Sequence, residues 1–256
     1  MICLIAESKT MRADLGKVDP GAVGHHMPVF ETKAAEIMAR MRDMPASAIA
    51  EAVRISQALA ARSRSMIYDF PDKSSGLRAI EAFTGVVFKA LDFTTLPTEA
   101  KEKAGSMVRI ISSLYGWLRP DDIIKPYRLD FTSRVAPGGG PLTAFWRNEL
   151  TDCLLTELKE SGSSTVIDLM PADAAKCFDW KRIASCADIY RIDFREITEG
   201  TSTRTPRSNR LKQLRGLLLR EILAGRIDSP ETLSNLSSDT FLPVGDAPEG
   251  LIRFLV

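Results

Sequence analysis

The chain has 256 residues, 45% hydrophobic residues and a formal net charge of +1. A chain of this length can bury one large core, and no Pro/Gly/Ser-rich linker divides it, so we predict a single domain over residues 1–256. A net charge so close to zero excludes a protein that holds nucleic acid through its overall charge, so any such binding must come from local asymmetry.

The elements predicted by hydrophobic periodicity alternate between strands and helices. Residues 1–5 form a buried strand and residues 47–64 one amphipathic helix. Residues 98–105 are helical and run into the apolar stretch 107–114, whose state the periodicity leaves open. Further helices are predicted at 141–159 and 206–224, and further strands at 165–170, 189–194 and 250–256. This order predicts an α+β fold with a mixed central sheet wrapped by helices.

No membrane contact is expected. There is no run of about eighteen apolar residues, and Glu7 and Lys9 interrupt the opening strand, so the signal-peptide pattern is absent. We therefore expect a cytoplasmic protein. No motif sets the oligomeric state, and we expect a monomer.

Four arginines lie among apolar and turn residues between positions 109 and 134. Arg109 stands between Val108 and Ile110, where a guanidinium needs a carboxylate partner or an anionic ligand. One interpretation is internal ion pairs with nearby aspartates. The other is an external anion, because three acids cannot neutralise all the cations: Arg109, Arg119, Arg128, Arg134 and Lys125 against Asp121, Asp122 and Asp130.

Short motifs spread over nearly the whole chain resemble those of the YaaA family of bacterial peroxide-stress proteins. Leu-Tyr-Gly occupies 114–116, Leu-Arg-Pro 118–120 and Pro-Tyr-Arg-Leu 126–129. The family's Ser-Pro-Ala-Lys-Thr is matched only by its last two residues. The other matching positions are Lys9, Thr10, Phe83, Gly85, Val87, Phe145, Trp146, Lys212, Arg215, Gly216 and Arg220.

One segment departs from the family pattern. Where the family has Asn-Leu-Ala-Ser-x-Glu-Tyr, residues 168–174 read Asp-Leu-Met-Pro-Ala-Asp-Ala, so the Glu-Tyr pair is replaced by Asp173 and Ala174. The resemblance implies a stress protein that binds duplex DNA through a helix-hairpin-helix and helps limit oxidative damage and free iron.

The helix predicted at 206–224 places a cation on its apolar side. Leu211, Leu214 and Leu218 form a stripe in which Arg215 falls, so Arg215 should face the core. It serves either an internal ion pair or an anion. From Thr201 to Arg220 the chain has basic residues and no acid, which is also typical of a solvated basic face.

Residues 79–91 can form two short helices joined at the turn 83–85. This layout fits a helix-hairpin-helix, in which backbone N–H groups at a glycine turn meet a phosphate. A simple helix corner is the alternative, since the second glycine usual in the motif is replaced by Val87.

Neither a metal nor a cofactor is expected. The two histidines, His25 and His26, are neighbours on a glycine-flanked loop and are expected at the surface, and the chain has no Glu-x-x-His, Walker loop, GxGxxG or GxSxG motif. No residue is designated as catalytic.

Two classes of function follow from these patterns. One is a protein that binds duplex DNA through phosphate contacts, and the other is an enzyme whose basic cleft takes a small phosphorylated or carboxylated substrate. An open groove would favour DNA and a closed pocket a metabolite. The candidate DNA- or anion-binding residues are Lys9, Thr10, Gly85, Lys89, Arg109, Tyr115, Arg119, Tyr127, Arg128, Arg134, Lys212, Arg215 and Arg220. The cleft of an enzyme would be lined by Lys9, Tyr115, Arg119, Tyr127, Arg128 and Arg215. We expect five of the cations to converge on one concave surface, namely Lys9, Arg109, Arg119, Arg128 and Arg215.

Overall fold

The N-terminal strand lies inside the main sheet of the computed structural model, which describes residues 1–17, 26–198 and 202–256. Strand β1 (Ile2–Ala6) is buried along its whole length, because parallel neighbours flank it and helices cover both faces. In the described part of the chain the sheet has eight strands, in the order β10 (Leu242–Val244), β11 (Leu251–Leu255), β8 (Asp188–Ile197), β7 (Thr165–Asp168), β1, β4 (Val108–Ser112) and β5 (Gly116–Leu118), with β9 (Thr203–Arg204) paired to β8.

The interior of this sheet is parallel and its edges are antiparallel. Strands β11, β8, β7, β1 and β4 all run in one direction, whereas β10 and β5 run in the opposite direction. The predicted mixed sheet is therefore confirmed, with residues 1–5 internal and residues 250–256 in the same sheet. The stretch 107–114, which periodicity left open, contains β4.

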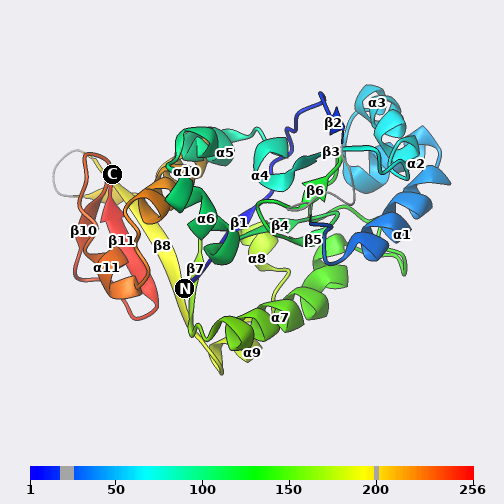
Figure 1. Ribbon diagram of the computed structural model, residues 1–256. Coiled ribbons are helices and arrows are strands. Elements are labelled where there is room, and N and C mark those ends of the chain that lie inside the picture. Colours follow the sequence, from blue (N-terminus) through cyan, green and yellow to red (C-terminus); the bar gives the residue numbers. More distant parts are fainter. Residues whose placement is uncertain (18–25, 199–201) are drawn as a thin grey trace.

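Helices cover both faces of the sheet (Figure 1). One face carries α5 (Val86–Leu91), α6 (Thr98–Met107) and α10 (Ser208–Ala224). The other carries α7 (Leu142–Ser161) and α9 (Trp180–Ala184). The helix-wrapped sheet agrees with the predicted architecture. The remaining short helices are α4 (Ala79–Ala82), η1 (Phe93–Thr95), α8 (Ala172–Ala175) and α11 (Pro230–Ser234).

A group of helices beside the β5 edge shows one error in the predicted elements. Residues 47–64 were expected to form one helix but form two, with Arg54 in the left-handed region at φ 57° between them. The Ser56 hydroxyl accepts a hydrogen bond from the Leu59 N–H at 3.2 Å and so begins a new helix. This group comprises α1 (Glu31–Arg42), α2 (Ala46–Val53), α3 (Gln57–Tyr68) and a small sheet of β2 (Gly16–Lys17), β3 (Ser75–Arg78) and β6 (Ile123–Ile124).

The two adjacent histidines are predicted to lie at the surface. His26 is exposed, 3.4 Å from Asp121, as expected, while His25 lies outside the described residues. No helix in the described ranges has the length and apolar character required to cross a membrane.

Candidate functional site

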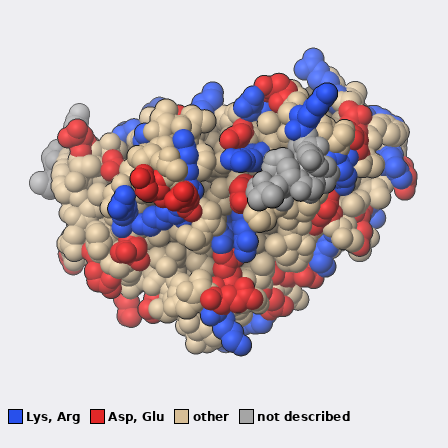
Figure 2. Space-filling model, in the orientation of Figure 1, with Lys and Arg blue, Asp and Glu red and all other residues tan. Residues whose placement is uncertain are grey.

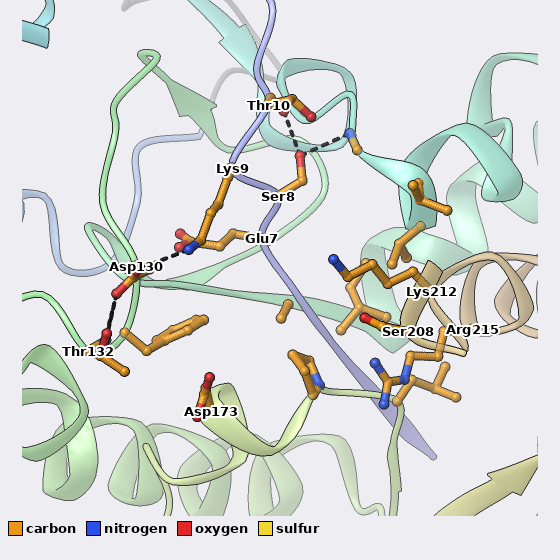
Figure 3. A pocket seen from close by; sticks show the side chains of 18 residues that line it. Glu7, Ser8, Lys9, Thr10, Asp130, Thr132, Asp173, Ser208, Lys212 and Arg215 are labelled. Atoms are coloured by element: carbon orange, nitrogen blue, oxygen red, sulfur yellow. Dashed lines mark hydrogen bonds and ion pairs between the residues drawn. The ribbon is translucent and has the colours of Figure 1, made fainter. Parts of the chain in front are cut away.

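A cavity of about 550 Å³ opens where β1 and β7 end. The chain leaves β1 toward β4 on one side and later returns to β7 on the other side. Connections that diverge in this way leave a crevice at the carboxyl ends of parallel strands, which is where open sheets bind ligands. The cavity is lined by residues 5–10 at the end of β1 and beyond it, 85–87 at α5, 130–132, residues 169, 171 and 173 after β7, and Ser208, Lys212 and Arg215 of α10 (Figure 3).

Glu7 follows the last residue of β1 and places its carboxylate in the cavity wall. Its Oε1 accepts a hydrogen bond from Ser113 Oγ at 2.6 Å, and its Oε2 accepts one from the Ser113 N–H at 2.7 Å. The Tyr127 hydroxyl also donates to Oε2. These donors hold the carboxyl group in one orientation at the cavity surface.

Burial raises the pKa of Glu7 from its usual value near 4.5 to about 7, although hydrogen bonds from Ser113 and Tyr127 act in the opposite direction. A carboxyl group with a pKa near neutrality can give or take a proton under physiological conditions. The sequence interpretation did not include Glu7 as a site residue. The available signal was a charged residue directly after a fully buried strand.

The raised pKa of Glu7 predicts a pH dependence of stability. The folded state binds the proton more tightly than the unfolded chain, so Glu7 contributes less stability as the pH rises from about 4.5 through about 7. We expect the stability of Glu7→Gln relative to wild type to increase by about 2 kcal/mol between pH 5 and pH 8. Urea unfolding of both proteins at the two pH values measures this change, and a difference independent of pH would contradict it.

Arg215 projects from α10 into the cavity, as its place in the apolar stripe predicted. Burial lowers the pKa of its guanidinium, and the nearby Asp168 carboxylate offsets only part of this effect. Asp168 is itself buried, with Arg191 at 3.7 Å and the Met170 N–H at 2.9 Å. Among the described residues, Arg215 forms no ion pair of its own.

The loop after β1 closes the opposite end of the cavity. Lys9 Nζ lies 2.9 Å from Asp130 Oδ2, and Asp130 also accepts hydrogen bonds from Thr132. The Gly85 N–H donates to the Ser8 hydroxyl at 3.0 Å. A Cβ at Gly85 would overlap the Ser8 side chain, so glycine permits this close approach.

Five of the thirteen candidate residues line the cavity, namely Lys9, Thr10, Gly85, Lys212 and Arg215. Tyr115 and Tyr127 are buried, and their hydroxyls bond within the protein. Arg128 and Arg220 donate to main-chain carbonyls, of Lys9 and of Leu91 and Asp92 respectively. The exposed residues that lie away from the cavity are Lys89, Arg119 and Arg134.

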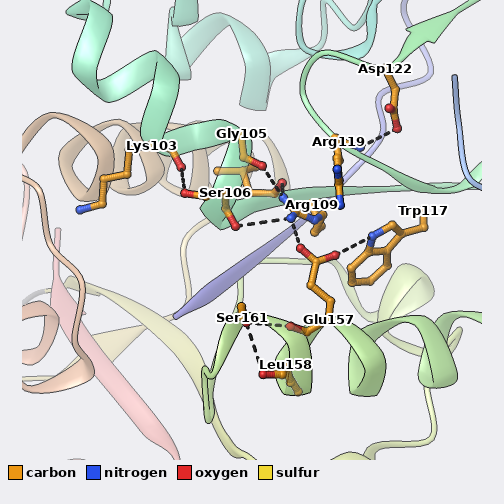
Figure 4. A network of polar contacts seen from close by, with 11 residues as sticks. Lys103, Gly105, Ser106, Arg109, Trp117, Arg119, Asp122, Glu157, Leu158 and Ser161 are labelled. Atoms are coloured by element: carbon orange, nitrogen blue, oxygen red, sulfur yellow. Dashed lines mark hydrogen bonds and ion pairs between the residues drawn. The ribbon is translucent and has the colours of Figure 1, made fainter. Parts of the chain in front are cut away.

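Arg109 has an internal carboxylate partner (Figure 4). It is 3% exposed on β4 and pairs with Glu157 of α7, while its guanidinium also donates to the Gly105 carbonyl at 2.9 Å. Glu157 accepts a second hydrogen bond, from the Trp117 indole at 3.2 Å. Of the five cations expected to converge on one concave surface, Lys9 and Arg215 line the cavity, whereas Arg109, Arg119 and Arg128 lie outside its lining.

Residues 79–91 form two short helices around the turn 83–85, as the pattern indicated. The turn differs from a phosphate-binding hairpin in one respect. The Gly85 N–H, which such a motif would present to a phosphate, is bonded to Ser8. A helix-hairpin-helix thus remains a hypothesis for this segment.

No group of three or more His, Cys, Asp or Glu side chains within the described ranges is arranged to hold a metal ion.

Comparison with known proteins identifies sequences similar along most of the chain. The family model described as "Peroxide stress protein YaaA" matches residues 1–243. A UPF0246 protein of Parabacteroides distasonis is 29% identical over 243 residues, which cover 94% of this chain and 93% of that protein. UPF0246 proteins of Phocaeicola vulgatus and Burkholderia mallei are 31% and 30% identical over 216 and 248 residues, covering 84% and 94% of this chain and 84% and 92% of the relatives.

Proposed function

The chain belongs to the family of the peroxide stress protein YaaA, and we propose that within this stress response its cavity binds a small phosphorylated or carboxylated molecule. The observation that carries the proposal is Arg215. Its partly buried guanidinium faces a cavity of about 550 Å³ without an ion-pair partner in the described residues. Such a group favours an anionic ligand, and the volume lies in the usual range of small-molecule sites, about 300–1,000 Å³.

Lys212 extends the cationic side of the cavity. It lies three residues before Arg215, so both side chains reach the same face of α10. Glu7 adds a carboxyl group with a pKa of about 7 to the same cavity. Together these groups could bind an anion and transfer a proton, which supports an enzyme acting on a small anionic substrate.

Non-specific binding of duplex DNA is the second candidate function. It is supported by cations on the surface of two packed helices, Lys89 on α5 and Arg207 to Lys212 at the start of α10. Through this binding the protein would help limit oxidative damage and free iron. The face shown in Figure 2 mixes basic and acidic residues, so phosphate contacts would depend on these few cations.

One set of titrations distinguishes the two functions. Inorganic phosphate should bind the wild-type protein, and Arg215→Ala should weaken binding about tenfold or more, because the guanidinium contributes charge-assisted hydrogen bonds. Arg62→Ala removes an exposed arginine of α3 outside the cavity and should leave the affinity unchanged. Calorimetry measures the phosphate affinity of the wild-type protein and of both variants. Equal affinities in the two variants would contradict a role for Arg215.

Duplex DNA provides the second arm of the experiment. About four phosphate contacts predict a slope of roughly −4 for the logarithm of the binding constant against the logarithm of salt concentration. Lys89→Ala should then flatten the slope by about one. A slope near zero would reject DNA binding, while phosphate binding lost in Arg215→Ala would leave the small-molecule function standing.

A further inference from the structure

The charges in the cavity are separated between two walls. Figure 3 shows Lys212 and Arg215 on the α10 side, and Glu7, Asp130 and Asp173 on the opposite side. The two cations come from one helix, whereas the three carboxylates come from the segments that follow β1, β6 and β7. A ligand that spans the cavity therefore meets cations at one end and carboxylates at the other.

Internal pairing reduces this set to four groups. Lys9 neutralises Asp130 at 2.9 Å, and hydrogen bonds from Thr132 complete that contact. What is left for a ligand is Lys212 and Arg215 on one wall, with Glu7 and Asp173 on the other. Asp173 has Lys176 at 3.1 Å, but both side chains are more than 60% exposed, so solvent weakens this pair.

The hydrogen bonds around Glu7 make it an acceptor in the ionised state. Ser112 Oγ accepts from the Leu114 and Tyr115 N–H groups, so its own proton is free to be donated to the Tyr127 hydroxyl at 2.7 Å. Tyr127 in turn donates to Glu7.

With Ser113 donating twice, three of the roughly four acceptor positions of the Glu7 carboxylate are occupied by protein donors. Because Glu7 lines the cavity, a ligand there can donate to the remaining position.

We infer that the cavity takes a bipolar ligand, with an anionic group bound by Lys212 and Arg215 and an ammonium group, or another strong hydrogen-bond donor, bound by Glu7. Small aminophosphates and amino acids have this chemistry. The inference rests on the proposed small-molecule function and adds the class of ligand. An anion without the donor group would leave the charge of the Glu7 carboxylate without a cation and its fourth acceptor position without a donor, which disfavours such a ligand.

Two probes of nearly equal size test the inference. Phosphoethanolamine carries a phosphate and an ammonium group, whereas ethyl phosphate carries the phosphate alone. Calorimetry at pH 8, above the pKa of Glu7, keeps its carboxylate ionised. Wild type should bind phosphoethanolamine about tenfold more tightly, which corresponds to about 1.4 kcal/mol.

Three variants show which residue causes the preference for phosphoethanolamine over ethyl phosphate. Glu7→Gln should bring the affinity ratio of the two probes close to one without weakening ethyl phosphate. Asp173→Asn, at an exposed position where folding is not at risk, should reduce the ratio by less. Arg215→Ala should weaken both probes together.

Each remaining outcome overturns a stated claim. Equal binding of the two probes by wild type, lost in Arg215→Ala, overturns the bipolar ligand and leaves the proposed function intact. If only Asp173→Asn removed the preference for phosphoethanolamine, Glu7 would not be the residue that binds the ammonium group. Absence of binding for both probes overturns the proposed function and the inference together. Thermal unfolding of Glu7→Gln shows whether the variant is folded when its affinities are measured.

Discussion

Replacing Arg109 by alanine is expected to lower the free energy of unfolding by about 3–5 kcal/mol, because the substitution leaves the partly buried Glu157 carboxylate without its partner. Arg109 connects β4 to α7 through this ion pair, and its guanidinium also binds the Gly105 and Val108 carbonyls at the junction between α6 and β4. Burial lowers the pKa of the guanidinium to about 10, so it stays charged at neutral pH. Urea unfolding at pH 7 measures the loss.

The matched control for this prediction is Arg119→Ala. Arg119 is exposed, and among the described residues only its main chain is hydrogen-bonded: its N–H donates to the Asp122 carboxylate at 2.8 Å and its carbonyl accepts from the Asp122 N–H at 3.2 Å. Its loss should change stability by no more than about 0.5 kcal/mol. If Arg109→Ala were equally mild while phosphate binding fell, Arg109 would have to serve a ligand after all.

Introducing valine at Gly216 is expected to destabilise the protein by about 3 kcal/mol, which is the upper end of the usual cost of overpacking, about 1–3 kcal/mol. Helix α10 packs against α5 at this glycine. A Cβ there would overlap the Val87 carbonyl oxygen and would lie 2.8 Å from the Ala90 Cβ. The Val87 carbonyl belongs to the backbone, so it cannot rotate away from an added Cβ as a side chain can. Because Val87 and Arg215 both line the cavity, phosphate binding should weaken as well.

Gly105→Ala is the control for the glycine substitution. Gly105 is also helical, in α6, and a Cβ there meets no atom within 4 Å. Alanine should stabilise this helix by roughly 0.5–1 kcal/mol. Thermal unfolding measures the Tm of both variants. If the Tm of Gly216→Val were no lower than that of Gly105→Ala, α5 and α10 could separate without cost.

Apolar patterning was sufficient to predict most of the elements. Residues 1–5 and 250–256 form strands of one sheet, and the predicted helices near 98–105, 141–159 and 206–224 are present. The amphipathic pattern at 47–64 failed because it does not register a single left-handed residue, Arg54, or the cap that restarts the helix. The flanking elements decide that the apolar stretch of β4 forms a strand, since a short apolar run suits either a strand or a buried helix.

The family, the helix-wrapped mixed sheet and the inward direction of Arg215 could be predicted from the chain alone, because periodicity and short motifs are local properties. Which cations share a cavity depends on how the chain folds. Arg109 and Arg215 both stand among apolar residues in the sequence. Glu157, 48 residues away in the chain, neutralises Arg109, whereas the Arg215 guanidinium faces the cavity. Glu7 likewise owes its raised pKa to burial in the folded protein, and the donors that oppose this shift are more than a hundred residues distant in the chain. Charge pairing acts through space, so residues far apart in sequence decide what each arginine or carboxylate is free to bind.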